Sequence, residues 1–156
     1  MAFKIVLVEP QIPPNTGNIG RLCIATKSEL HLVEPLGFDI TEKAVRRAGL
    51  DYWKHINLTI HPSYAAFREA VGADARLFFF TKFATTTLYE TKFQKDDYLV
   101  FGKETTGLPP EVHANEPKDR LLRVPMPGQD IVRSLNLAGT AHVAIYEALR
   151  QTEFNA

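Results

Sequence analysis

Short apolar runs recur along the chain and predict β-strands. The predicted strands cover residues 4–9, 30–34, 56–60, 76–80, 98–102 and 121–124. The first run combines β-branched residues and leucine and is followed by Pro10, which is typical of a buried strand that stops at a turn. The chain therefore begins with a strand, and further strands follow at intervals to residue 124.

Apolar residues at helical spacing fill most of the gaps between these runs. They predict helices from about Ile19, over residues 41–48 and over residues 63–71. Thr41 and Ser63 stand where N-terminal capping residues are expected. Strands that alternate with helices predict an α/β fold, with a mostly parallel sheet and helices on both faces.

The last predicted helix, from about Ser134 to Gln151, has a broad apolar face that includes Ala141, Ile145 and Ala148. This face is wider than one contact with a sheet would cover. We therefore expect part of it to pack against a partner chain.

Residues 11–18 are predicted to form a loop, because Pro13-Pro14 disfavours both helix and strand. Arg21 then falls in the first turn of the next predicted helix, where a cation opposes the positive end of the helix dipole. A charge placed against the local electrostatics is a hint of function. A solvated or salt-bridged surface arginine would explain the same position.

The composition fits one globular domain over residues 1–156, with 45% hydrophobic and 23% charged residues. The first apolar run is too short for a signal peptide or a membrane span, so we expect a cytoplasmic protein without membrane contact. Cys23 is the only cysteine, which excludes an intrachain disulfide. The five histidines lack a His-x-x-x-His spacing, so we expect no metal site.

The 18 basic and 18 acidic residues give a formal net charge of zero. Dedicated nucleic-acid binders are usually basic overall. If the partner is RNA, binding must depend on a local basic patch, on an assembled oligomer or on shape recognition.

Three polar segments that contain glycine lie at the ends of predicted strands or close after them. They are residues 15–21 (NTGNIGR), 102–109 (GKETTGLP) and 123–128 (RVPMPG), the last leading to Ser134 and Asn136. Gly102 permits a close backbone approach and Gly107 a positive φ. Each segment alone also fits an ordinary connection or turn, and Ser134 also fits a helix N-cap. Together they suggest backbone-lined loops that converge on a polar ligand.

In this order and at these separations, the three segments resemble the motifs of the SPOUT superfamily of RNA methyltransferases. Residues 9–19 (EPQIPPNTGNI) and 46–52 (RRAGLDY) resemble its small single-domain branch, which methylates the ribose 2′-hydroxyl of nucleotide 34 in tRNA. The similarity runs from about Lys4 to Gln151. It implies S-adenosylmethionine as cofactor, tRNA as substrate, a C-terminal trefoil knot, and a homodimer whose active sites are completed across the interface.

The resemblance also implies roles for individual residues. Backbone groups bordering the knot would hold the cofactor's adenosine, around Phe80, Gly102, Val124 and Ser134. Catalytic groups would come from all three segments, namely Asn15, Asn18, Arg21, Glu104, Ser134 and Asn136. The chain departs from the family at Ala138-Gly139-Thr140, where Ser-Asn is usual, and at Gly20, which adds flexibility beside Arg21.

A basic patch is predicted where Lys43, Arg46 and Arg47 share one face of a helix at i, i+3 and i+4 spacing. Arg133 adds a cation next to the third segment. We expect these four residues to bind RNA, although a solvated helix face would show the same spacing.

The reaction needs aligned atoms and removal of a proton from a weakly acidic hydroxyl. Arginine stays protonated in proteins, so we expect Arg21 to position a phosphate and stabilise developing oxyanion charge. It would act as a base only if a substrate phosphate accepted the proton. Two alternatives remain, namely 2′-O-methylation of ribosomal RNA and a catalytically silent RNA- or nucleotide-binding module.

Overall fold

The computed structural model describes residues 3–41 and 52–154. Their centre is a seven-stranded sheet with the strand order β3-β2-β1-β6-β4-β7-β5, in which every neighbouring pair is parallel. The strands are β1 (Lys4–Val8), β2 (Glu29–Val33), β3 (Leu58–His61), β4 (Leu77–Phe80), β5 (Thr86–Thr87), β6 (Tyr98–Phe101) and β7 (Leu121–Arg123). The six predicted strands are confirmed with shifts of one or two residues at their ends, and only the two-residue β5 was not predicted.

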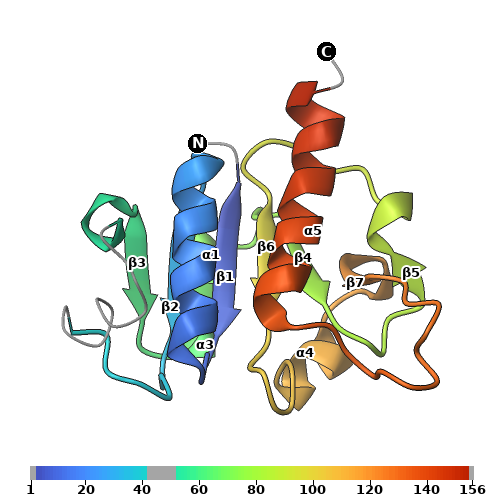
Figure 1. The fold of residues 1–156 in the computed structure, drawn as a ribbon, viewed down its shortest axis with the longest axis horizontal. Helices are drawn as coiled ribbons and strands as arrows, with labels where there is room; N and C mark the ends of the chain where they lie inside the picture. Colours follow the sequence, from blue (N-terminus) through green and yellow to red (C-terminus); the bar gives the residue numbers. More distant parts are fainter. Residues whose placement is uncertain (1–2, 42–51, 155–156) are drawn as a thin grey trace.

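Helices cover both faces of this sheet, as predicted. The α-helices are α1 (Pro13–Ala25), α3 (Tyr64–Val71), α4 (Pro110–Asn115) and α5 (Leu137–Leu149). Helices α1 and α5 lie side by side on one face, and α3 lies behind the sheet (Figure 1). One buried cluster joins the sheet to Leu22 and Ala141 on the first face, and a second joins it to Phe67 and Val112 on the other.

Shorter helical turns complete the fold. They are η1 (Trp53–His55), η2 (Leu88–Glu90), η3 (Lys118–Arg120) and the π-helix η4 (Arg150–Phe154). The predicted helix over residues 41–48 lies almost wholly outside the described residues. Helix α3 has the predicted caps, because the Ser63 side chain accepts a hydrogen bond from the Ala66 amide and Gly72 ends the helix at φ 82°.

The start of α1 corrects the prediction of a loop over residues 11–18. Pro13 and Pro14 occupy the first helical positions, where proline has no N–H to leave unpaired and its fixed φ already suits a helix. Arg21 therefore lies roughly two turns beyond the helix start and not in its first turn. The argument that Arg21 opposes the helix dipole was wrong for this reason.

Helix α5 begins at Leu137, three residues later than predicted. Its N-cap is Asn136, whose side chain accepts a hydrogen bond from the Gly139 amide at 3.2 Å. Ser134 is therefore not the capping residue. A Cβ at Gly139 would meet nothing within 4 Å, so this departure from the family pattern lies at an open position on the helix.

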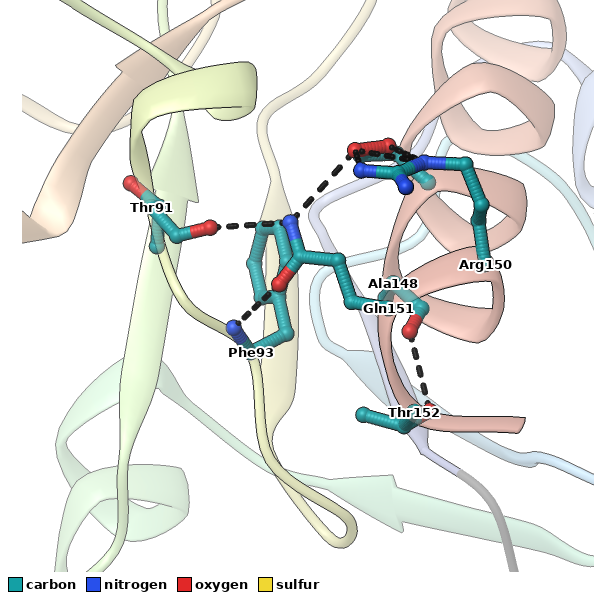
Figure 2. Close-up of polar contacts among 7 residues, drawn as sticks. Thr91, Phe93, Ala148, Arg150, Gln151 and Thr152 are labelled. Carbon is teal, nitrogen blue, oxygen red and sulfur yellow. Dashed lines mark hydrogen bonds and ion pairs between the residues drawn. The ribbon is translucent and has the colours of Figure 1, made fainter. Parts of the chain in front are cut away.

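The far end of α5 is tied to the chain that follows η2. Gln151 accepts a hydrogen bond from the Phe93 amide and donates one to the Thr91 carbonyl, both at 2.9 Å (Figure 2). Arg150 forms an ion pair with the buried Glu147 at 2.7 Å, and this pairing holds the pKa of the Glu147 carboxyl below its usual range. These contacts fix the C-terminal helix against residues 91–93.

The apolar face of α5 packs against the core of its own chain. Ala141, Ile145 and Ala148 are fully buried against the sheet and α1, so the prediction that this face reaches a partner was wrong for these residues. The large apolar side chains that α5 leaves exposed are Val143 and Tyr146.

A polar pair lies within the core on the α3 side of the sheet. His31 on β2 and His61 on β3 stack at 5.2 Å between ring centroids, and His31 Nδ1 lies 2.9 Å from His61 Nε2. Glu29 approaches the other nitrogen of His31 at 3.3 Å, while Phe67 and Tyr98 pack edge-on. Burial lowers the pKa of both histidines below the ordinary value.

We expect the free energy of unfolding to fall as the pH drops below about 6.5, the ordinary pKa of histidine. The folded protein holds these histidines neutral, so the unfolded chain binds more protons in this range. Denaturant unfolding at pH 7.5 and 5.5 measures the difference. The His61→Phe variant removes one titrating ring and should show a smaller difference, whereas an unchanged pH dependence would contradict the assignment.

Candidate active site

The carboxyl ends of β1, β6, β4 and β7 meet at one edge of the sheet, because these parallel strands are direct neighbours. Ligands of open α/β sheets bind outside this edge. A cavity of about 560 Å³ lies there, within the usual range for ligand pockets. Of the residues expected at the site, it is lined by Asn15, Phe80, Gly102, Glu104, Val124, Arg133, Ser134 and Asn136.

Glu104 connects the second polar segment to the first. Its two carboxylate oxygens accept hydrogen bonds from the backbone amides of Gln11 and Ile12, each at 2.8 Å. One of them also accepts from the Asn15 side chain at 3.2 Å. The carboxylate thus accepts hydrogen bonds from amides just before α1, which have no partner within the helix. Negative charge is favourable at this end of a helix. Within the site, Glu104 therefore positions the start of α1 and the Asn15 side chain.

The third segment joins the same chain of contacts. The side-chain amide of Asn136 donates to Asn15 Oδ1 at 3.1 Å, and Asn136 Oδ1 caps α5. A continuous series of hydrogen bonds therefore runs from Glu104 through Asn15 to Asn136 and the start of α5. The three segments that stand far apart in the sequence form one hydrogen-bonded wall of the cavity.

Glycine is required at two positions of the loop after β6. A Cβ on Gly102 would lie 2.1 Å from the Gly107 carbonyl carbon and 2.2 Å from the Leu108 nitrogen. Gly107 has φ 76°, as predicted, and exchanges two backbone hydrogen bonds with Lys103. The close approach expected at Gly102 is thus made by the loop's own backbone.

Arg21 and Asn18 lie apart from the cavity. Both are exposed on α1, and neither is among the described residues that line the cavity. The Arg21 guanidinium lies 5.4 Å from the centroid of the Tyr52 ring. Gly20 is buried beneath Ile56 and Trp53, where a Cβ would approach to 2.6 Å and 3.2 Å, so close packing accounts for a glycine at this position.

The remaining predicted basic residues divide into two groups. Arg133 is exposed and lines the cavity. Lys43, Arg46 and Arg47 lie outside the described residues, so their patch stays a prediction.

Several cavity residues were missed in the sequence. Thr81, Lys82 and Phe83 follow β4 directly, and their place at a strand's carboxyl end was the signal that could have found them. His113 comes from α4 and approaches Thr81 Oγ1 with its Nε2 at 2.8 Å. Arg123 at the end of β7 has a buried Nε without a hydrogen-bond partner among the described residues.

Residues 3–41 and 52–154 contain neither a candidate metal centre nor a candidate membrane span. No group of three or more His, Cys, Asp or Glu side chains there is placed to hold a metal ion. No helix in these ranges is long and apolar enough to cross a bilayer.

The sequence profile described as the SpoU rRNA Methylase family matches residues 2–146, which is nearly the whole chain. The chain belongs to this family. A relative from Polaromonas sp. (strain JS666 / ATCC BAA-500), named tRNA (cytidine(34)-2′-O)-methyltransferase, is 49% identical over 97% of this chain and 92% of its own length.

Solved structures of other proteins share the architecture. One, described by the words "Structural insights into the 2-OH methylation of C/U34 on tRNA", superposes with a TM-score of 0.88 at 49% identity, over 96% of this chain and 95% of that one. The more distant SpoU methyltransferase AviRb from Streptomyces viridochromogenes, in complex with AdoMet, gives a TM-score of 0.77 at 24% identity. It is matched over 95% of this chain and 57% of its own length, and it shows the shared fold.

The cavity of this SpoU protein combines apolar walls with a buried polar donor. Phe80 stacks on Phe101 at 4.8 Å between ring centroids, and with Leu108 and Leu137 these rings supply apolar walls. The Arg123 Nε, which has no partner within residues 3–41 and 52–154, is a donor that a ligand oxygen can satisfy. These residues therefore fit S-adenosylmethionine, the methyl donor that methyltransferases use.

Proposed function

We propose that this chain is an S-adenosylmethionine-dependent methyltransferase that modifies the ribose 2′-hydroxyl of nucleotide 34 in tRNA. Family membership and the 49% identity to a relative of that name support the reaction and the substrate. The observation that carries the proposal is the cavity at the carboxyl edge of the sheet, whose wall is built by Glu104, Asn15 and Asn136.

The bound cofactor would supply an electrophilic methyl group beside that wall. Backbone around Gly102 and Val124 would hold its adenosine against Phe80, as the SPOUT resemblance implies, with Ser134 at the other side of the cavity. The paired amides of Asn15 and Asn136 present fixed polar groups that can orient the substrate ribose.

Charge on the substrate oxygen needs a cation. The Glu104 oxygens already accept hydrogen bonds from two backbone amides and from Asn15, so this carboxylate is poorly placed to accept a proton from substrate. A guanidinium group is cationic and has several N–H donors, which suits a phosphate and a developing oxyanion. We assign Arg21 this role.

A homodimer would bring Arg21 to a cavity. In one chain Arg21 is exposed on α1 and does not line the cavity, so a second copy must supply it. Helix α5 lies beside α1 and exposes Val143 and Tyr146. We propose that these two helices form the interface and that each active site combines Arg21 of one subunit with the cavity of the other.

The Tyr146→Glu variant should be monomeric and inactive, because a charge in an apolar interface loses its solvation. Sedimentation measures the mass, and methyl transfer to tRNA measures activity. Tyr89→Glu, at an exposed tyrosine on η2, is the matched control and should stay dimeric. A fully active Tyr146→Glu monomer would refute the shared site.

Comparing 2′-O-methyl groups in RNA from cells with and without the gene tests the function. Loss of the methyl group at nucleotide 34 of tRNA is expected. Loss of a ribosomal RNA methyl group would favour the ribosomal alternative. No change in either RNA, with RNA binding intact, would favour a silent binding module.

We further propose that residues 1–156 form one cytoplasmic domain with the C-terminal trefoil knot that the resemblance implies. A tRNA substrate supports a cytoplasmic location. Strand β7 lies between β4 and β5 although it follows both in the chain, and Gln151 ties the end of the chain to residues 91–93. Both observations support a knotted path.

A further inference from the structure

Phe83 is an exposed aromatic ring at the rim of the cavity. It follows β4 directly, lines the cavity and leaves 69% of its surface exposed, more than Tyr89 or Tyr146. A phenylalanine that stays this open adds little to the core. Because Phe83 also lies beside a ligand cavity, we look to ligand binding for its role.

The ring is held in place from one side. Thr81 Oγ1 accepts a hydrogen bond from the Phe83 amide at 3.3 Å, and the Thr81 carbonyl accepts one from the Ala84 amide. The same Thr81 hydroxyl is paired with His113, whose ring lies edge-on to Phe83 at 5.6 Å and 80°. The hydrogen bonds define the turn, and the Phe83 ring projects outward from it.

The charge around this ring suits a polyanion. Lys82, with its ammonium 5.3 Å from the Phe83 centroid, lines the cavity together with Lys103, Arg123 and Arg133. Glu104 is the only carboxylate among the described lining residues, and its oxygens serve the amides before α1. S-adenosylmethionine carries a net positive charge, and one of its oxygens can satisfy the buried Arg123 Nε, so Lys82, Lys103 and Arg133 are the basic groups that the cofactor does not explain. RNA phosphates at the rim do explain them.

We propose that Phe83 is a stacking platform for an unpaired RNA base next to the target nucleotide, with Lys82 pairing with the adjoining phosphate. This inference rests on the proposed function, because it assumes that RNA enters the cavity. Proteins read single-stranded RNA loops by stacking splayed bases on aromatic rings beside basic groups. The aromatic ring, its fixed turn and the neighbouring ammonium group provide this arrangement.

The test compares Phe83→Ala, Phe83→Trp and the control Tyr89→Ala. Phe83→Ala should raise KM for the tRNA at least about fivefold, the lower end for losing one base–aromatic stack. It should leave kcat and the affinity for S-adenosylhomocysteine within about twofold of wild type. Phe83→Trp should restore KM because it keeps an aromatic face, and Tyr89→Ala should have no effect.

A second measurement identifies the stacked base. Stem-loop RNAs that each lack one base beside the target nucleotide are bound to wild type and to Phe83→Ala. At one position, removing the base should weaken binding to wild type at least about fivefold and have no effect on Phe83→Ala. Equal losses in both proteins at every position would overturn the proposal.

Other results also overturn it. Weaker S-adenosylhomocysteine binding by Phe83→Ala would place the ring against the cofactor, and a changed mass in sedimentation would place it in a protein interface. If wild type does not methylate the tRNA, the proposed function itself fails. If wild type methylates it and Phe83→Ala is indistinguishable, only the stacking proposal fails.

Discussion

Replacing Arg21 by alanine should reduce methyl transfer at least about 100-fold, the low end for loss of one electrostatic stabiliser. The affinity for S-adenosylhomocysteine should stay almost unchanged, because the proposed contacts of Arg21 are with the substrate phosphate and the developing oxyanion and not with the cofactor. Single-turnover transfer to tRNA and calorimetry with S-adenosylhomocysteine measure the two effects. Near-normal turnover would remove Arg21 from the mechanism.

Mixed dimers decide which subunit uses Arg21. We expect homodimers of either variant to be inactive. Arg21→Ala lacks the cation, and Asn136→Ala lacks the hydrogen bond to Asn15 in the wall of the cavity. A mixed dimer would unite the intact cavity of the first with the intact Arg21 of the second. Random mixing should therefore restore about a quarter of wild-type activity, since half of the dimers are mixed and each has one complete site. No recovery would mean that Arg21 acts within its own chain.

Replacing Gly102 by valine should abolish cofactor binding. The added Cβ would lie 2.1 Å from the Gly107 carbonyl carbon, far inside the contact distance of carbon atoms. The loop would have to move and would take Glu104 away from the amides of Gln11 and Ile12. Calorimetry with S-adenosylhomocysteine should then detect no binding at millimolar concentration.

Gly128→Ala is the matched control for this variant. A Cβ at Gly128 meets nothing within 4 Å, and Gly128 is not among the described residues that line the cavity. Its cofactor affinity should equal that of wild type. Normal binding by Gly102→Val would show that the loop can rearrange without losing the ligand.

Local sequence was sufficient for the strands and for the edge of the sheet where the site lies. The run at residues 77–80 is buried throughout, so its apolar pattern reflects the environment directly. Ser63 begins α3 and Gly72 ends it. Each forms a hydrogen bond with a residue three or four positions away, so these interactions are also local. Polar segments after parallel strands must meet at one edge, and they do.

Contacts between distant residues explain the errors in the sequence-based predictions. Pro13-Pro14 is compatible with a loop or with a helix start, and the carboxylate of Glu104, roughly ninety residues away, lies at the amides just before the helix. Ser134 and Asn136 are both good caps by residue type. Packing of α5 against the sheet and the hydrogen bond to Asn15 selected Asn136.

The sequence by itself determined a parallel α/β fold, the three segments that build the cavity and eight of the residues that line it. These features follow from burial and from strand direction, which repeat along each element. Only the tertiary structure decided that Arg21 lies outside its own cavity and that His113 on α4 lies at the cavity. Those positions depend on how separate helices and strands pack against one another. The hydrophobic pattern within one segment carries no information about that packing.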